Sequence, residues 1–425
     1  MARPLALTAY LGLSRIAHPL ARLLIRLRLA RGKEDPVRYP ERLGEPGLAR
    51  PKASVIWFHG ASVGEAMSIL PLVRAYLDAA PDVEALMTTG TLTSARRLEG
   101  LLPPRCRHQF VPVDTAQAVR AFLDHWRPDL AIWVESEFWP RLMVETAARG
   151  IPMVLANARV SETSAKRWEG AGGMAAYLTG LFSAIDAQDD ETVARLTALG
   201  TEPAKLRMAG NLKALAPVPE ADPEALADWE TRLGDRPVWL AASTHPGEEE
   251  AVLDAHVVLP PETVLILAPR HPDRGRIVAE MIKERQMPFI RLSLGEVLGP
   301  ETRVILADTL GQMGLWLRLA PISFIGGSIV AMGGHTPFEP AAIGSAILHG
   351  PHTENFAPAY AALARTQGAR QIGSDSELAR EITVLSHDHS ARAEMVARAR
   401  VVQDLAPDIT AMVRQGLALM AGSKP

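Results

Sequence analysis

The alternation of short apolar runs with longer amphipathic stretches constrains the fold of this 425-residue chain more than any other feature. Apolar runs bounded by polar residues or glycine predict buried strands, and stretches such as 68–79, 116–126 and 140–149 have helical spacing. This alternation is typical of parallel sheets covered by helices on both faces. The predicted strands form two series, 55–60, 83–90, 108–114, 129–135 and 152–158, then 238–244, 263–269, 289–293, 303–308, 321–327 and 345–351.

The two series imply two domains, because the chain exceeds the size of a usual single core. We predict an α/β protein of two doubly wound, Rossmann-like domains with ligands at the carboxyl ends of the strands. The segment between the series is rich in Pro, Asp and Glu and opens as a linker. The final helices are candidates for packing back on the first domain. The predicted boundaries are 34–213 for the first domain, 214–236 for the linker and 237–425 for the second domain.

Residues 1–33 contain seven basic residues and no acidic residue. Apolar residues fill the spaces between them, but Arg15 and Pro19 are among the residues that interrupt any apolar span of about 20 residues. This pattern predicts a basic amphipathic helix on an anionic membrane surface, or a short tilted anchor. A surface helix that covers the neighbouring domain is the open alternative.

Composition and motifs exclude several other classes of protein. The single cysteine, Cys106, excludes an internal disulfide and fits a reducing compartment. A net charge of −3 without a long basic tract predicts no nucleic-acid partner. We expect no metal ion, because metal-ligating motifs are missing from the sequence and Asp189 and Asp190 are better placed to begin a helix.

The segment 324–356 is the strongest indication of a ligand. Its glycine pair Gly333 and Gly334 permits close approach of the backbone to a ligand and positive φ angles. A helix that begins just after this loop directs free N–H groups at an anion, and Glu339 in its first turn can accept hydrogen bonds from a ribose diol. The segment predicts a pocket for a nucleotide with phosphate and sugar.

Polar residues also follow several predicted strands. In HGASVGE (59–65) a capped loop accounts for Ser62 and Glu65 but not for His59. In WVESEFWP the carboxylates Glu135 and Glu137 share one side of an extended backbone, between tryptophans whose low polarity suits acid–base chemistry; one of the two is expected to cap the next helix.

Other candidates are weaker alone. Glu41 lies in RYPERLG and is a candidate catalytic residue. The alternative interpretation is that neighbouring Glu and Arg side chains form an exposed, solvated surface. Arg270 and His271 end a strand of the second domain, and the fork of the guanidinium suits a phosphate. Lys213 lies near the junction of the domains.

Together these segments resemble the 3-deoxy-D-manno-octulosonic acid (Kdo) transferases of lipid A biosynthesis. The resemblance runs from about residue 38 to 356, and its order and spacing are more specific than any single motif. The matching segments are ERLG, HGASVGE, ESEFWP, NARVS, GNLK, STHPGEEE, APRHP, GGS, GGHTPFEPAAIG and GPHTENF. The chain departs mildly from the family pattern at three places. Thr336 and Arg141 stand where asparagine is common, and the first loop reads HGASVGE rather than HSVSVGE.

The resemblance implies a GT-B glycosyltransferase at the cytoplasmic face of the bacterial inner membrane. It implies inverting, metal-independent transfer of Kdo from CMP-Kdo to the lipid A precursor lipid IVA, without a cofactor. Glu41 is the implied general base, with Glu135 and Glu137 shaping the site. The implied acceptor-binding residues are Arg42, His59, Ser62, Gly64 and Glu65. The implied donor-binding residues are Lys213, Arg270, His271, Gly333, Gly334, His335, Thr336, Glu339 and Asn355.

Two other functions remain open at this stage. Another GT-B nucleotide-sugar enzyme, such as an epimerase, would share the glycine loop and the ribose-binding glutamate, but would not need ERLG or a basic N-terminus. A catalytically inactive nucleotide-sugar-binding membrane protein would keep the pocket and lose the base. The presence of Glu41, Glu135 and Glu137 argues against it.

Overall fold

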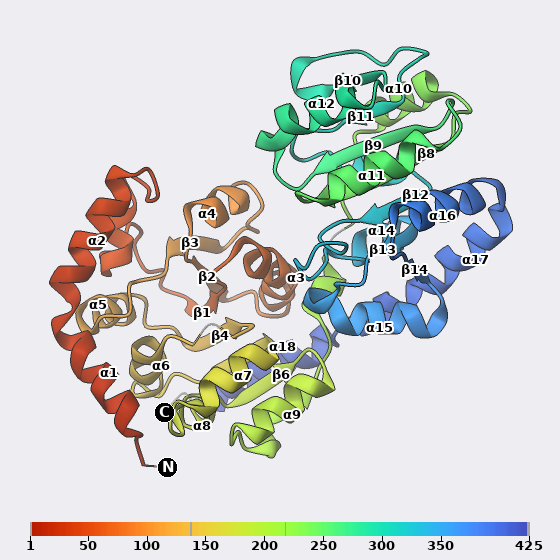
Figure 1. The fold of residues 1–425 in the computed structure, drawn as a ribbon. Coiled ribbons are helices and arrows are strands. Elements are labelled where there is room, and N and C mark those ends of the chain that lie inside the picture. The colour runs from red at the N-terminus through yellow and green to blue at the C-terminus, as the bar shows by residue number, and fades with distance from the viewer. Residues whose placement is uncertain (1, 137, 217, 423–425) are drawn as a thin grey trace. The chain divides into compact units, whose positions relative to one another are not determined.

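The computed structural model describes residues 2–136, 138–216 and 218–422. They form two compact units (Figure 1): unit 1 contains the described residues of 1–216 and 406–425, and unit 2 those of 217–405. Each unit is built on a wholly parallel sheet with helices on both faces, so the predicted α/β class is confirmed.

The described strands of unit 1 form one sheet in the order β3-β2-β1-β4-β5-β6-β7. The strand order reverses between β1 and β4, which pair in parallel. In an open α/β sheet such a reversal leaves a crevice at the carboxyl ends of the strands. The strands are β1 (Ser54–His59), β2 (Val83–Thr89), β3 (Cys106–Phe110), β4 (Leu130–Val134), β5 (Met153–Ala158), β6 (Ala184–Ala187) and β7 (Leu206–Met208).

Alternate residues of the central strand β1 enter different cores. Trp57 packs with a cluster on one face of the sheet, and Ile56 and Phe58 pack with a cluster on the other. The helices of unit 1 are α1 (Leu5–Ile16), α2 (His18–Ala30), α3 (Val63–Ala79), α4 (Leu92–Leu98), α5 (Ala116–Trp126), α6 (Pro140–Ala147), α7 (Glu162–Glu169), α8 (Met174–Gly180), α9 (Asp190–Ala198) and α18 (Ile409–Gly422), with the 3-10 helices η1 (Tyr39–Leu43), η2 (Pro203–Lys205) and η3 (Leu212–Leu215).

Residues 1–33 form two helices rather than one, because Pro19 stands in the first turn of α2. Helix α1 packs on α5 and α6, and α2 packs on α5 and η1 (Figure 1). Leu7 and Leu11 enter the core of unit 1 through this contact. None of the helices formed by the described residues combines the length and hydrophobicity that a membrane span requires.

The sheet of unit 2 has the order β10-β11-β9-β8-β12-β13-β14 among the described residues, and it reverses between β8 and β12. Its strands are β8 (Val238–Thr244), β9 (Val264–Pro269), β10 (Phe289–Arg291), β11 (Val304–Leu306), β12 (Ile322–Ile325), β13 (Ala346–His349) and β14 (Ala369–Gln371). Its helices are α10 (Pro223–Leu233), α11 (Glu248–Val257), α12 (Gly275–Glu284), α13 (Met313–Leu319), α14 (Phe338–Ile343), α15 (Ala357–Thr366), α16 (Asp375–His387) and α17 (His389–Ala399), with the 3-10 helices η4 (Pro272–Arg274), η5 (Leu292–Leu294), η6 (Glu354–Phe356) and η7 (Arg400–Leu405).

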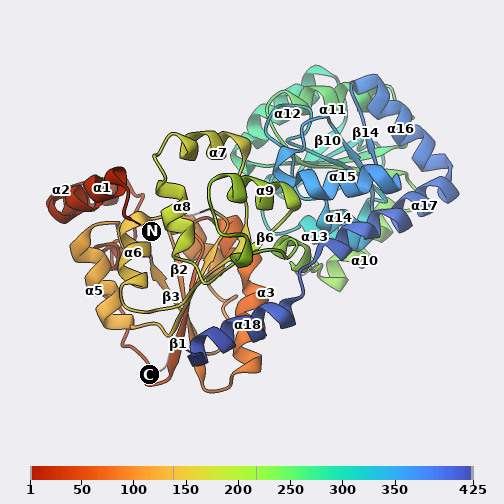
Figure 2. The same cartoon turned by 90° about the horizontal axis from the view of Figure 1, so that it is seen from below.

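The structure differs from the predicted boundaries at both ends of unit 2. Much of the segment expected as a linker is folded: α10 packs on α13, with the rings of Trp229 and Trp316 at 5.4 Å. The chain returns to unit 1 after residue 405, and α18 lies beside α3 (Figure 2). Asp189 caps α9, as predicted.

Candidate functional site

Three non-glycine residues adopt left-handed backbone angles where strands end. Glu135 follows β4 with a φ of 58°, Asn157 is the penultimate residue of β5 with a φ of 54°, and Ser243 lies near the end of β8 with a φ of 57°. Such conformations cost free energy for residues with a Cβ atom and cluster at functional sites. In both units they mark the carboxyl edge of the sheet, and the strands of Glu135 and Ser243, β4 and β8, form the reversal of the strand order.

Glu41 lies in η1, and its side chain is only 5% exposed. Its Oε1 accepts a hydrogen bond from Arg38 Nε at 2.9 Å. Its Oε2 accepts from Arg38 Nη2 at 2.9 Å and from the backbone N–H of Phe110 at 2.8 Å. The expected exposed Glu–Arg surface is therefore not found, and the carboxylate is fixed beside a cavity of about 530 Å³.

The glycine of ERLG is required by geometry. Gly44 ends η1 with a φ of 87°, and a Cβ atom there would lie 2.3 Å from the carbonyl oxygen of Ala118. The buried Arg42 of the same turn donates to the carbonyl of Val111 and lies 3.7 Å from Glu34, so these groups hold the guanidinium predicted to bind the acceptor.

At the end of β4, Glu135 forms an ion pair with Lys213 at 2.8 Å. The structure brings together a predicted catalytic carboxylate and a predicted donor-binding lysine within unit 1. The 3-10 helix η3 places Lys213 there, because Asn157 Oδ1 accepts from the backbone N–H of Leu212 at 2.9 Å. Glu137 lies outside the described residues, so the choice between the two carboxylates stays a prediction.

The HGASVGE loop is a capped helix start. Ser62 Oγ donates to Glu65 Oε1 at 2.7 Å, and Glu65 Oε2 accepts the backbone N–H of Ala61 at 2.8 Å. Ser62 and Gly64 are exposed at this edge. His59 is completely buried: its Nδ1 lies 2.9 Å from Thr88 Oγ1, and burial lowers its pKa to about 3. This geometry gives His59 a packing role, and its acceptor contact stays a prediction.

In unit 2 the predicted residues Arg270, His271 and His335 gather at the ends of β9 and β12. Arg270 is exposed just after β9. His245, which follows β8, joins them: its Nε2 lies 2.8 Å from Nε2 of His335, and its ring lies 6.0 Å from that of His271. Burial, followed by the charges of His245, Arg270 and His271, lowers the pKa of His335 to about 4, so His335 is neutral at pH 7.

The glycine loop is braced by Asn355, another predicted donor-binding residue. Its Nδ2 donates to the carbonyl of Met332 at 2.8 Å, and its backbone N–H donates to the carbonyl of Gly333. Gly333 has a φ of 86°, and a Cβ atom there would lie 2.6 Å from Asn355 Nδ2. Gly334 also has a positive φ, and Thr336 Oγ1 accepts from Phe338 N at the start of α14, whose first turn contains Glu339.

A completely buried carboxylate underlies this loop. Glu248, the first residue of α11, accepts four backbone N–H groups. Oε2 accepts from His245 at 3.0 Å and Gly327 at 2.6 Å, and Oε1 accepts from Ser328 and Ile329 at 2.9 Å each. These loop amides therefore already bind an internal anion.

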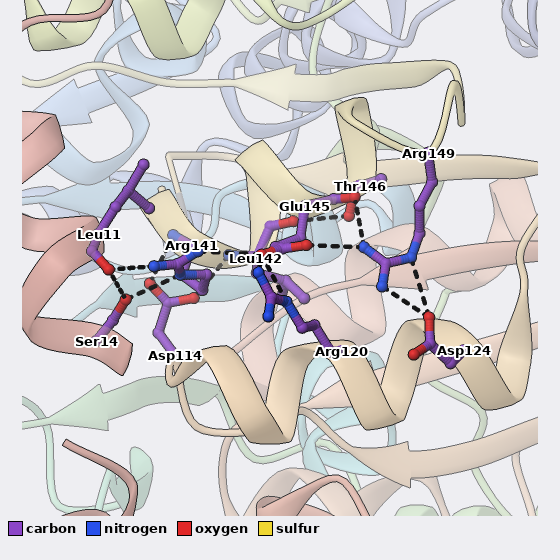
Figure 3. Close-up of polar contacts among 10 residues, drawn as sticks. All are labelled: Leu11, Ser14, Asp114, Arg120, Asp124, Arg141, Leu142, Glu145, Thr146 and Arg149. Atoms are coloured by element: carbon purple, nitrogen blue, oxygen red, sulfur yellow. Dashed lines mark hydrogen bonds and ion pairs between the residues drawn. The ribbon is translucent and has the colours of Figure 1, made fainter. Parts of the chain in front are cut away.

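Arg141, one of the departures from the family pattern, connects α6 to α1 (Figure 3). It is buried, and it donates to the carbonyl of Leu11, to Ser14 Oγ at 2.8 Å and to Glu145 at 3.0 Å. Asp114 accepts the first N–H groups of α6 and the hydroxyl of Tyr10. The basic N-terminal helix is thereby fixed to the helix that follows ESEFWP.

Among the described residues, no group of three or more His, Cys, Asp or Glu side chains is placed to hold a metal ion. The sequence reasoning missed Arg38, His108 and Glu248. The spacing of three residues between Arg38 and Glu41 could have indicated their contact. His108 meets Arg38, and Glu248 meets the amides of 327–329, only because the folded sheets bring together residues that are distant in sequence.

Comparisons with known proteins point to one family. Residues 37–216 match the family model described as 3-deoxy-D-manno-octulosonic-acid transferase (kdotransferase). The 3-deoxy-D-manno-octulosonic acid transferase of Haemophilus influenzae is 35% identical over 392 residues, which are 90% of this chain and 91% of that protein. The probable mitochondrial transferase of Arabidopsis thaliana is 34% identical over 388 residues, covering 88% and 87%.

Among solved structures, the UDP-GlcNAc 2-epimerase of Neisseria meningitidis bound to UDP-GlcNAc has a TM-score of 0.60 at 12% identity and covers 86% of this chain and 100% of its own. This likeness concerns the fold alone, and it confirms the predicted GT-B class. The identities to the curated transferases extend over both units. The chain belongs to the 3-deoxy-D-manno-octulosonic acid transferase family, and it is a glycosyltransferase.

Proposed function

We propose that this Kdo transferase moves Kdo from CMP-Kdo to lipid IVA with inversion and without a metal ion. The observation that carries the proposal is the Glu41 carboxylate, held in one orientation at the wall of a cavity that is large enough for part of a sugar acceptor. A general base must be fixed within hydrogen-bond reach of the proton it removes.

In the proposed reaction, Glu41 takes the proton of an acceptor hydroxyl while that oxygen attacks the anomeric carbon of Kdo. The bond between this carbon and the phosphate oxygen breaks, and CMP leaves with the electron pair. Arg270, exposed and always charged, binds the phosphate in this proposal. The neutral His335 donates or accepts a hydrogen bond without adding charge. Glu135, held by Lys213, supports positive charge developing on the sugar.

The N-terminal helices are the proposed contact with the cytoplasmic face of the inner membrane. Large apolar side chains of α1 and α2 are at least half exposed, among basic residues. Such a surface binds anionic lipid by apolar burial together with charge. The residues are Leu5, Leu13, Ile16, Leu20, Leu23 and Leu24. Replacing Leu23 and Leu24 by serine is expected to reduce sedimentation with anionic vesicles; unchanged sedimentation contradicts this contact.

The test of the reaction is an assay with CMP-Kdo and lipid IVA, with and without EDTA, analysed by mass spectrometry of the lipid product. We expect a mass increase of one or more Kdo units that EDTA does not suppress. Glu41→Gln is expected to lose about a hundredfold or more of kcat while retaining CMP binding. Glu45→Gln, at the same cavity, is the matched control. An unchanged rate for Glu41→Gln removes the assignment of the base.

A further inference from the structure

The hydrogen bonds of Glu41 leave one of its oxygens less occupied than the other. A carboxylate offers about four lone-pair positions on its two oxygens. Oε2 accepts from Arg38 Nη2 and from Phe110 N, whereas Oε1 accepts only from Arg38 Nε among the described residues. The open lone pair therefore belongs to Oε1.

Gly47 lies directly beside this oxygen. A Cβ atom at Gly47 would lie 2.9 Å from Glu41 Oε1, closer than real Cβ contacts permit. The loop that contains Gly47 lines the same cavity as Glu41. The missing side chain at this position thus leaves space against Oε1 on the side of the cavity.

Arg38 is itself held in one orientation. Its Nη2 lies 2.9 Å from His108 Nδ1 and donates to the carbonyl oxygen of His108 at 2.9 Å. The guanidinium carbon lies 4.9 Å from the ring centroid of Phe110. Because a guanidinium only donates, Nδ1 of His108 must accept, and its Nε2–H then donates to Thr89 Oγ1 at 2.9 Å.

The other titratable groups near Glu41 are compatible with Arg38 as the group that holds its carboxylate. Burial, followed by the charge of Arg38, lowers the pKa of His108 to about 3, so His108 is neutral during turnover near pH 7. Asp35 accepts the backbone N–H of Arg38, and Glu45 lines the cavity. Arg38 is therefore the cation that hydrogen-bonds directly to Glu41 among the described residues.

We infer that Arg38 is a positioning residue that turns Oε1 of Glu41 toward the acceptor, and that Gly47 provides the opening through which the acceptor hydroxyl reaches Oε1. This inference rests on the proposed role of Glu41 as the base. The proton of the hydroxyl passes to Oε1 while the oxygen forms the new bond to the anomeric carbon and CMP departs. The proton is later released to water.

The test compares Arg38→Met, Arg38→Lys and Gly47→Ala in the full chain, with Arg120→Met as the control. Arg120 pairs with Glu145 in the same unit, 3.0 Å away, and does not contact Glu41. We expect Arg38→Met to lower kcat about 10- to 100-fold with little change in KM for the donor.

Arg38→Lys restores the charge without the two-pronged geometry, so kcat is expected to recover only in part. Gly47→Ala is expected to lower kcat about 10-fold or more, again with little change in KM for the donor. An Arg38→Met enzyme with wild-type kcat overturns the inference. If Arg38→Met does not fold, the kcat values of Arg38→Lys and Gly47→Ala decide instead, and wild-type kcat in both overturns it.

Carboxyl ¹³C NMR of Glu-labelled protein separates this inference from the proposed function, because it requires no turnover. Glu41→Gln assigns the Glu41 signal. A Glu41 carboxyl signal that shifts or broadens in Arg38→Met supports the positioning role even if lipid IVA proves not to be the acceptor. A signal unchanged from wild type overturns the role even if Kdo transfer is observed.

Discussion

Replacing Glu248 by glutamine tests the internal anion of the glycine loop. The carboxylate accepts four backbone N–H groups, two on each oxygen, at 2.6 to 3.0 Å, and the residue is completely buried. Glutamine has the same shape, but its carbonyl oxygen serves only two of these groups. The other two donors would face an NH₂ group. At about 1–3 kcal/mol for each buried unsatisfied group, the expected loss is about 2–6 kcal/mol.

Hydrogen exchange measured by mass spectrometry reports the loss of stability in the loop itself. This local measurement is needed because the unfolding of a protein with two units does not give a single free energy. A loss of about 2 kcal/mol or more corresponds to about 30-fold or faster exchange in peptides covering 325–331. Glu250→Gln is the control, since Glu250 accepts one backbone N–H, that of Gly247, at the start of the same helix. Glu248→Gln exchange within about threefold of wild type would refute the reasoning.

Two further predictions concern unit 1. Arg141→Asn removes the donors to Leu11 and Ser14 and is expected to speed hydrogen exchange in α1 about 10-fold or more. The control Arg149→Asn removes contacts to Asp124 of α5 and Glu145 of α6 and is expected to leave α1 protected. Equal exchange of α1 in both variants contradicts the role of Arg141 in fixing α1 to α6. The folded-state pKa of His59 lies below its usual 6.5, at about 3, so its stabilising contribution is complete above pH 6.5 and is lost as pH falls toward 3. His59→Gln is therefore expected to reduce the loss of unfolding free energy between pH 7 and pH 5 by about 2 kcal/mol in urea titrations; an unchanged pH dependence shows that His59 does not contribute.

The central strands could be predicted because a buried strand appears in the sequence as a continuous run of apolar residues. The edge strands β7 and β14 were not predicted, since three residues that are mostly exposed or half-buried carry no apolar run. The helical C-terminal stretch was predicted, with its final helices as candidates for packing back on the first domain, but which helix returns to unit 1 depends on side chains far apart in sequence. Tyr76 of α3, for example, donates to the carbonyl of Met412 at 3.1 Å.

The candidate site shows the same limit. Glu41 received its role through a segment that resembles a family, whereas Arg270 was also indicated by its place at the end of a predicted strand. The neighbours that set their chemistry, such as His108 beside Arg38, come from the register of parallel strands. The left-handed backbone at Glu135 could not be predicted from the sequence, because glycine is typical of positions with a positive φ and glutamate is not.

The return of α18 to unit 1 bears on how the protein is made. Met412 and Val413 of α18 belong to the same buried cluster as Ile56, Phe58 and Tyr76. During synthesis, the residues of α18 are translated only after all of unit 2. Until then, the part of unit 1 that precedes unit 2 in sequence has an uncovered apolar face where α18 will pack. A nascent chain arrested before residue 406 should attract chaperones through the face that α18 later covers.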